Sequence, residues 1–293
     1  IILILLTFIN GTFFSRYILA KDTVYLEVYE IGFIGIIFLT TASYLIHLLL
    51  PLNLIVNSLF FFLITIFTIN YHLKDLKFLT KQNYIILSIS FFVVIFMTLK
   101  YRPNEDYGYY HLPYLINIIS EKVIFGLANL QVNFAWNSSW LNFTSLFNLP
   151  FLELKGTQLA NSVLFFFVLL MFLNEINKKE NYNKISFYFI LFLSSYILIK
   201  FSRLSEHGFD FPANISLMIC FYYFLKIYEE NKINLICKNF TFLLVFSTYC
   251  LTIKLSTFIS PLLVFFAFLY IYKKINLNLI FRPIIFCLVL FIL

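Results

Sequence analysis

The stretch from Ile31 to Leu50, IGFIGIIFLTTASYLIHLLL, decides the class of this protein. It holds twenty residues without one Asp, Glu, Lys or Arg. A helix that crosses the hydrocarbon core of a bilayer needs about 20 predominantly apolar residues. The stretch therefore predicts a helix that crosses a membrane.

The composition of the whole chain of 293 residues supports this interpretation. Hydrophobic residues make up 61% of the chain and charged residues only 12%, whereas a soluble domain is about half apolar and about a quarter charged. Disorder is excluded as well, because disordered chains combine low hydrophobicity with high charge. We predict an all-α, polytopic integral membrane protein.

Ten apolar segments are predicted as membrane helices. They span residues 1–14, 31–50, 52–70, 83–99, 157–174, 185–199, 212–228, 239–253, 255–272 and 278–293. Only a short connection near Lys254 separates the segments 239–253 and 255–272. Residues 239–272 could therefore form one hairpin that does not cross the membrane fully, and the predicted number of membrane helices is about nine to ten. Because the chain opens on Ile1 and stops within an apolar run, we expect a fragment truncated at both ends, with one transmembrane domain over 1–293.

Lysine and arginine set the predicted orientation, because cytoplasmic loops of membrane proteins are enriched in both. If 71–82 is cytoplasmic, strict alternation places four more segments on that side: 15–30, 175–184, 229–238 and 273–277. With Lys226 at the inner end of its helix, this side holds 13 of the 21 Lys and Arg residues, and the outer side holds seven. Cytoplasmic anchors thus explain the net charge of +7, and no nucleic-acid partner is expected.

Residues 100–156 form the longest connection, on the predicted outer side. Long loops are usually functional or disordered, and this one is too apolar and aromatic for disorder. Four apolar residues repeat in it with the spacing i, i+3, i+4 and i+7: Leu112, Leu115, Ile116 and Ile119. With Pro113 suited to a first turn, they predict an amphipathic helix in the membrane interface.

The first group of candidate chemical residues lies in 104–113, NEDYGYYHLP. Glu105 and Asp106 are adjacent carboxylates, and His111 follows them. A carboxylate at the membrane surface can take a proton from an acceptor hydroxyl or bind Mg²⁺ or Mn²⁺. The alternative is a solvated helix cap in which the acids interact with the helix dipole. Both interpretations stay open.

The second group lies in 200–210, KFSRLSEHGFD. Arg203, Glu206, His207 and Asp210 have the spacing of one helical face. The alternative is an exposed ion pair between Arg203 and Glu206 or His207, worth about 0.3–0.5 kcal/mol.

Three further features complete the candidates. Lys254 has little polar company, which indicates a function or a partner, although a lysine at the outer end of its helix can also reach the interface with its ammonium group. His47, alone on an apolar helix, is more often structural. The four cysteines show no metal or disulfide spacing and are expected as free packing residues: Cys220, Cys237, Cys250 and Cys287.

The candidate residues converge on one predicted face. Three segments far apart in the sequence place both acidic groups and Lys254 on the outer side, whereas a carrier keeps ionisable residues near the bilayer midplane. No GxGxxG, P-loop, HExxH or GxSxG pattern is present, so nucleotide and zinc-peptidase chemistry lack support.

These residues resemble the GT-C membrane glycosyltransferases. Residues 104–113 carry the resemblance, supported by 137–140 (NSSW), 203–210 and Lys254. The chain is also similar to bacterial multi-spanning proteins with a Tyr-His-Leu-Pro signature, described only as membrane proteins of unknown function. The likeness covers about residues 83–275.

The resemblance implies transfer of a sugar from a polyprenyl-phosphate donor to a glycan, lipid or protein acceptor, outside the cytoplasm, at the bacterial cytoplasmic (inner) membrane. It implies Asp106 as the catalytic base with Glu105 as its substitute, His111 as an orienting residue, and a divalent metal, Mg or Mn, at Asp106 and Asp210. Arg203 and Lys254 would neutralise the departing phosphate. The full set of expected substrate-binding residues is Arg102, Tyr110, Asn137, Trp140, Arg203, Glu206, His207 and Lys254.

Two other functions stay open. A transporter, flippase or polymerase-associated protein for lipid-linked glycans would have a polar cavity through the membrane. In an inactive scaffold, the side chains of Glu105, Asp106, Asp210 and Lys254 would point apart.

Overall fold

The computed structural model describes residues 1–18, 26–72, 81–99, 106–130, 132–135, 138–272 and 281–292. In these ranges no strand forms beyond an isolated bridge between Leu149 and Glu153, which confirms the all-α prediction. The α-helices are α1 (Ile2–Ile18), α2 (Val28–Leu49), α3 (Leu54–His72), α4 (Lys81–Thr98), α5 (Leu112–Ser120), α6 (Ser139–Ser145), α7 (Leu154–Thr157), α8 (Ala160–Asn177), α9 (Ile185–Ile199), α10 (Asp210–Glu229), α11 (Ile233–Ile253), α12 (Ser260–Ile271) and α13 (Phe281–Ile292).

Each of the ten predicted apolar segments coincides with a helix, from α1 to α4 and from α8 to α13. Among the residues described, four helical stretches are long and apolar enough to cross a membrane: α2, Leu154–Asn177, α10 and α11. The other apolar helices are shorter. After a break at Lys254, the twelve-residue α12 packs against α11, which fits two crossing helices as well as the hairpin alternative.

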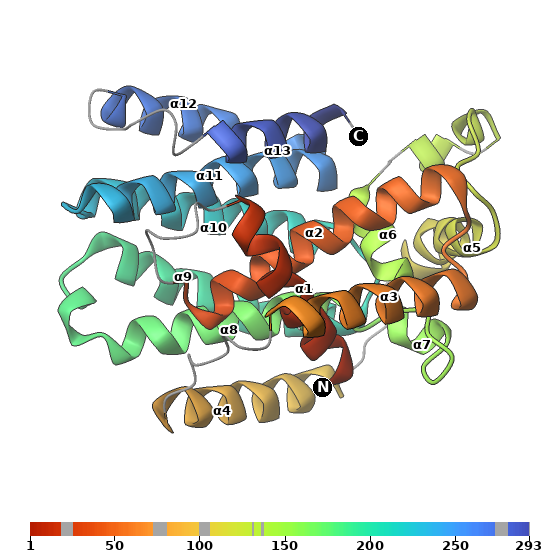
Figure 1. Cartoon of the computed structure of the whole chain (residues 1–293), viewed down its shortest axis with the longest axis horizontal. Coiled ribbons are helices and arrows are strands. Elements are labelled where there is room, and N and C mark those ends of the chain that lie inside the picture. Colours follow the sequence, from red (N-terminus) through yellow and green to blue (C-terminus); the bar gives the residue numbers. More distant parts are fainter. Residues whose placement is uncertain are drawn as a thin grey trace.

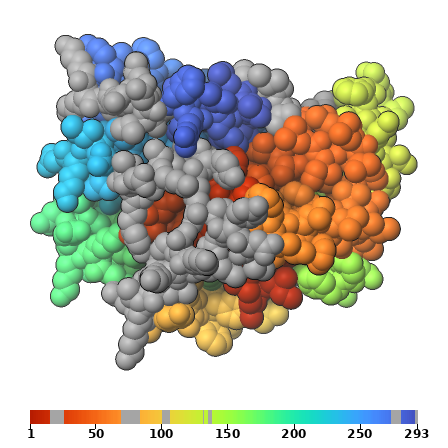
Figure 2. Space-filling model, in the orientation of Figure 1, coloured from red at the N-terminus to blue at the C-terminus, as the bar shows by residue number. Residues whose placement is uncertain are grey.

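Central and flanking helices differ in what their side chains meet. α2, α8, α10 and α11 supply much of the buried core, including Phe33, Phe167 and Phe246. Large apolar side chains are exposed along α3, α4, α9, α12 and α13, among them Phe92 at 70%. Figure 1 shows these flanking helices around the central ones, and Figure 2 shows α3, α4 and α13 at the surface of the same face.

The opening helices cross at very short range. A Cβ atom on Gly35 of α2 would overlap the Thr7 carbonyl oxygen of α1, and one on Gly11 would overlap the Ile31 carbonyl oxygen. Glycine at both positions therefore lets the two backbones touch, as small residues do between membrane helices.

The helix ends sort into two opposite groups. α5, α6 and α7 gather at one end of the molecule, and the connection from α8 to α9 lies at the other (Figure 1). At the α8–α9 end, Glu30 near the start of α2 pairs with Lys238 of α11, and Glu175 of α8 pairs with Lys226 of α10. These helix ends are the ones that the alternation of spans placed on one side.

The long connection differs in part from the prediction. A helix does form over Leu112–Ser120 with Pro113 in its first turn, but it buries Leu115 and Ile118 while Ile116 is 44% exposed. One side of α5 therefore packs on α6, and the placement of α5 in the membrane interface stays a prediction. α6 itself is entirely buried, so this part of the connection belongs to the core.

Candidate functional site

A wide helical turn presents the first acidic group. Asp106 precedes the π-helical turn Tyr107–His111, in which the Leu112 N–H donates to the Tyr107 carbonyl. Asp106 is exposed and makes no side-chain hydrogen bond that caps this turn, whereas His111 is buried. π-helical turns occur often at functional sites, and the choice between chemistry and helix capping stays open, because Asn104 and Glu105 lie outside the described residues.

The second group does not form the single helical face that its spacing predicted. A 3₁₀ turn covers Phe201–Ser205, the chain is extended at Glu206, and α10 begins at Asp210. The cause lies in α8, because the Asn161 amide donates to the carbonyls of Arg203 and Glu206 at 2.9 and 3.1 Å. These side-chain bonds replace helical backbone bonds and hold the segment open.

The structure brings the two groups together around one small cavity of about 200 Å³, which we call the Asp106 site. Its lining is Asp106, His111, Tyr196, Lys200, Arg203, Glu206, Gly208, Asp210, Phe211 and Asn214. Gly208 lies beside both His111 and Glu206. A Cβ atom on this residue would lie 3.7 Å from His111 Nε2 and 3.8 Å from Glu206 Oε2.

Two ion pairs border this cavity. Arg203 Nη1 lies 2.9 Å from Glu206 Oε2, which is the pairing that the alternative interpretation expected. Lys254 Nζ lies 2.6 Å from Asp210 Oδ1, so this lysine has a charged partner. The Asp210 side chain is 70% exposed, and exposed pairs of this kind are weak and readily exchanged.

Burial changes the protonation of the two histidines. Desolvation lowers the pKa of His111 to about 4, against an opposing effect of Asp106 and Asp210. Desolvation, with a smaller effect of His111, lowers the pKa of His207 to about 4. Both imidazoles are therefore neutral at pH 7 and able to accept a proton or a hydrogen bond.

His207 turns away from the cavity lining. Its Nε2 lies 2.5 Å from Thr157 Oγ1, and its ring stacks on Tyr107 at 5.2 Å. The Nδ1 atoms of His111 and His207 are buried and make no hydrogen bond within the described part of the chain. Burial raises the pKa of the Glu206 carboxyl, while Arg203 opposes the rise.

The remaining expected residues are spread more widely. The Tyr110 ring lies 4.2 Å from that of His111, and burial raises the pKa of its hydroxyl. Trp140 is fully buried on α6 against Phe143, in the apolar core. The expected Glu105, Arg102 and Asn137 lie outside the described residues.

His47 and the four cysteines have the structural roles that the sequence predicted. His47 Nε2 lies 3.1 Å from the Glu121 carbonyl oxygen, a satisfied structural contact. The four cysteines are free and buried.

The expected divalent metal stays a prediction. Asp106 and Asp210 both line the cavity and offer the oxygen ligands that Mg²⁺ prefers. One of them already holds Lys254, and no set of three His, Cys, Asp or Glu side chains suited to a metal comes together among the residues described.

Sequence reasoning missed several contributors to this site. Tyr196, Lys200 and Asn214 line the cavity, and Asn161 and Ser162 position the second segment from α8. Asn161 and Ser162 interrupt the predicted apolar span 157–174, and polar residues inside a membrane span are often functional. That signal could have identified them.

A second polar cluster, at the α8–α9 end, was also not predicted from the sequence. Its lysines were interpreted only as cytoplasmic anchors, but they pair with buried glutamates of other helices. Counting the acids of the inner segments together with the bases would have revealed this pairing.

Comparison with known sequence families gives a match over the whole chain. A sequence family described as Domain of unknown function (DUF8201) matches residues 1–293. Neither the curated proteins nor the solved structures give a match.

Proposed function

The chain belongs to the DUF8201 family, and we propose that it is a GT-C-type membrane glycosyltransferase acting at the Asp106 site. One observation carries the proposal: Asp106 and His111 share a cavity with Arg203, Glu206 and Asp210, which lie about a hundred residues further along the chain. A cleft that unites a carboxylate with cations is suited to transfer chemistry with a phosphate leaving group.

A multi-pass location in the bacterial cytoplasmic membrane goes with this function. Four stretches have the length and apolar character for crossing a bilayer. The exposed apolar side chains of α3, α4, α9, α12 and α13 would be costly in water and are favourable in lipid. With the α8–α9 end cytoplasmic, as the lysine distribution predicts, the Asp106 site faces outward, where the polyprenyl-phosphate sugar is the donor.

The side chains of the Asp106 site supply the proton acceptor and the orienting group of the reaction. Asp106 takes the proton of the acceptor hydroxyl, whose oxygen attacks the anomeric carbon of the donor. The bond from that carbon to the phosphate oxygen breaks as the new glycosidic bond forms. The leaving polyprenyl phosphate carries away the bonding electron pair, and neutral His111 orients the acceptor by accepting or donating a hydrogen bond.

Three positively charged side chains can stabilise the negative charge that develops on the phosphate. Lys200 and Arg203 line the cavity, and Lys254 reaches it through Asp210. Because the Asp210 side chain of this pair is 70% exposed, exchanging its carboxylate for a phosphate oxygen costs little. The leaving group is thereby stabilised where its charge appears.

The common cavity also favours this function over an inactive scaffold. In a scaffold, Asp106, Asp210 and Lys254 would point apart, but Asp106 and Asp210 line one cavity and Lys254 pairs with Asp210. A transporter or flippase for lipid-linked glycans remains the second interpretation, and the transfer assay separates the two.

The test is replacement of Asp106 by Asn. A general base contributes about 100-fold to about 10,000-fold, so we expect D106N to lose at least about 100-fold in sugar transfer from a polyprenyl-phosphate donor in proteoliposomes. The matched control is Glu121→Gln, which removes an exposed carboxylate at the same end of the molecule but outside the cavity.

E121Q should retain activity, and both variants should keep the thermal stability of the parent protein. Full transfer by D106N would refute the role of Asp106. Equal loss in both variants would show that charge at this end, rather than a catalytic base, matters.

A further inference from the structure

A larger cavity lies at the opposite end of the molecule from the Asp106 site. Its volume is about 780 Å³, and its lining includes Glu30, Glu175, Lys226, Lys238, Tyr222 and Tyr223. The start of α2, the end of α8, the end of α10 and the start of α11 form it. On the predicted topology it faces the cytoplasm.

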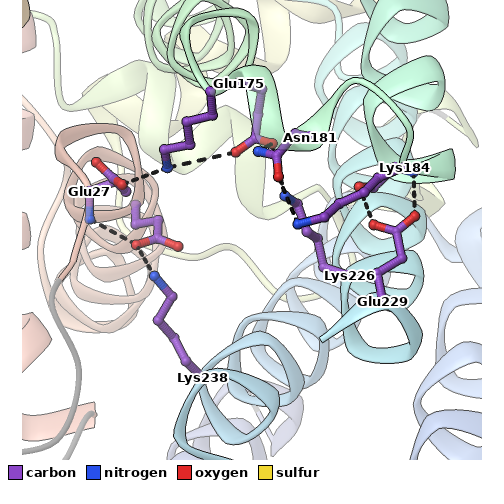
Figure 3. A network of polar contacts seen from close by, with 10 residues as sticks. Glu27, Glu175, Asn181, Lys184, Lys226, Glu229 and Lys238 are labelled. Atoms are coloured by element: carbon purple, nitrogen blue, oxygen red, sulfur yellow. Dashed lines mark hydrogen bonds and ion pairs between the residues drawn. The ribbon is translucent and has the colours of Figure 1, made fainter. Parts of the chain in front are cut away.

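Paired charges build the wall of this cavity. The Glu30–Lys238, Glu175–Lys226 and Glu27–Lys178 pairs are each 2.8 Å long, and we call these six residues the Glu–Lys network. Figure 3 shows Glu27, Glu175, Lys226 and Lys238 of the network reaching toward one another from separate helices. Glu30 is 1% exposed, Glu175 2% and Lys238 9%.

The pairing argues against a ligand with net charge. An anion would have to compete for Lys238 or Lys226 and would leave a buried glutamate without its partner, which is strongly unfavourable. A cation would leave a buried lysine in the same position. A neutral ligand that accepts hydrogen bonds from the lysines and donates them to the carboxylates disturbs neither pair.

The tyrosines narrow the chemistry further. The Tyr223 ring stacks on Phe242 at 4.9 Å, and Lys226 Nζ lies 5.4 Å over the Tyr222 ring. One face of each ring is therefore occupied, and both residues line the cavity. The Tyr223 hydroxyl is buried near the Glu30 carboxylate and makes no hydrogen bond of ordinary geometry among the described residues. A buried hydroxyl normally has one.

We propose that this cavity is a binding site for a neutral, hydroxyl-rich glycosyl group, either free or at the head of a lipid. Hydroxyl groups both donate and accept, so a sugar satisfies the carboxylates, the ammonium groups and the Tyr223 hydroxyl at once. The inference does not depend on transfer at the Asp106 site, and D106N should bind the same ligands unchanged.

The experiment measures binding to the full chain in lipid nanodiscs free of sugar detergents. The probes are glucose, mannose, galactose and N-acetylglucosamine, each as the free sugar and as its octyl glycoside, with octylphosphocholine as a zwitterionic head group on the same chain. Calorimetric titration gives the affinity, and a rise in melting temperature with ligand concentration confirms it.

Tyr223→Phe is the decisive variant. Removing a hydroxyl that hydrogen-bonds to the ligand should weaken binding about fivefold, without lowering the melting temperature of the ligand-free protein. The matched control is Tyr249→Phe on α11, because the Tyr249 hydroxyl is equally buried but lies 3.3 Å from Thr40 Oγ1, outside the cavity. Y249F should keep the parental affinity.

A charge exchange separates binding from structure. The double variant E30K/K238E retains an ion pair between α2 and α11 but reverses its direction, and it also removes the carboxylate that accepts from the Glu27 N–H at the start of α2, so its thermal unfolding is measured beside its binding. We expect a folded protein with at least about tenfold weaker sugar binding.

Binding of free sugars and glycosides supports the proposal, and binding of glycosides alone supports a lipid-borne sugar. The proposal is overturned by binding of none of the sugars, by preference for octylphosphocholine, or by unchanged affinity in both Y223F and E30K/K238E.

Discussion

At the scale of single residues, the two buried histidines make a prediction about pH. The folded-state pKa values of His111 and His207 are about 4, below the ordinary 6.5. Between these values the unfolded chain binds more protons, so the free energy of unfolding falls as the pH is lowered from about 6.5 to about 4. The full shift is worth about 3 kcal/mol per histidine.

We therefore expect a lower melting temperature at about pH 5 than at about pH 7, and a smaller decrease for His111→Gln, whose side chain does not titrate. Thermal unfolding of both proteins in nanodiscs at the two pH values measures this. An identical decrease in parent and variant would show that His111 is not protonated on unfolding in this range.

Single residue types predicted part of the candidate site from the sequence. Asp106, His111, Arg203, Glu206 and Asp210 could be selected by residue type alone, because carboxylates, imidazoles and guanidinium groups are rare in apolar chains. Their common cavity could not be derived from the helical spacing of the second group, since Asn161 and Ser162 bind its carbonyls from another helix.

At the scale of elements, the contact between α1 and α2 makes the second prediction. A methyl group on Gly35 meets the Thr7 backbone, which cannot rotate away as a side chain can. Gly35→Ala should therefore force the helices apart and lower the free energy of unfolding by about 1–3 kcal/mol.

Gly108→Ala is the matched control, because no heavy atom lies within 4 Å of the added Cβ position. It should change stability by no more than about 0.5 kcal/mol. Thermal unfolding of the two variants checks the comparison, and equal stability would contradict the close packing of α1 on α2.

The helices themselves were largely predictable, and their orientation about their own axes was not. Long apolar runs specify a helix wherever they occur in a membrane protein. For α5, the sequence pattern predicted an amphipathic helix at the membrane interface, but it did not predict that α5 packs on α6 and buries Ile118. The burial of α6, with its Ser, Asn and Thr residues, depends on neighbours that no local pattern records.

At the scale of the whole molecule, we expect the Asp106 end and the α8–α9 end to lie on opposite sides of the membrane. Glu121 and Lys232 are exposed at the Asp106 end and the α8–α9 end, respectively, and the natural cysteines are buried. In intact cells, a membrane-impermeant thiol reagent should label Glu121→Cys, and it should label Lys232→Cys only after permeabilisation. The reverse pattern would place the Asp106 site in the cytoplasm.

The grouping of the helix ends followed from the alternation of spans, whereas the two cavities did not. Alternation of spans correctly grouped the helix ends that carry Glu30, Glu175 and Lys238. That these charges are buried and paired depends on the packing of four helices, which the order of residues along one chain does not display.

The most direct test of the central claim is release of polyprenyl phosphate by the purified wild-type protein. Polyprenyl-phosphate hexose, N-acetylhexosamine and pentose donors, radiolabelled in the sugar, are incubated in nanodiscs with membrane extract as the source of acceptor. We expect that one donor loses its sugar to an acceptor and leaves free polyprenyl phosphate. If all three donors remain intact while the protein stays folded, the Asp106 site is not a glycosyltransferase centre.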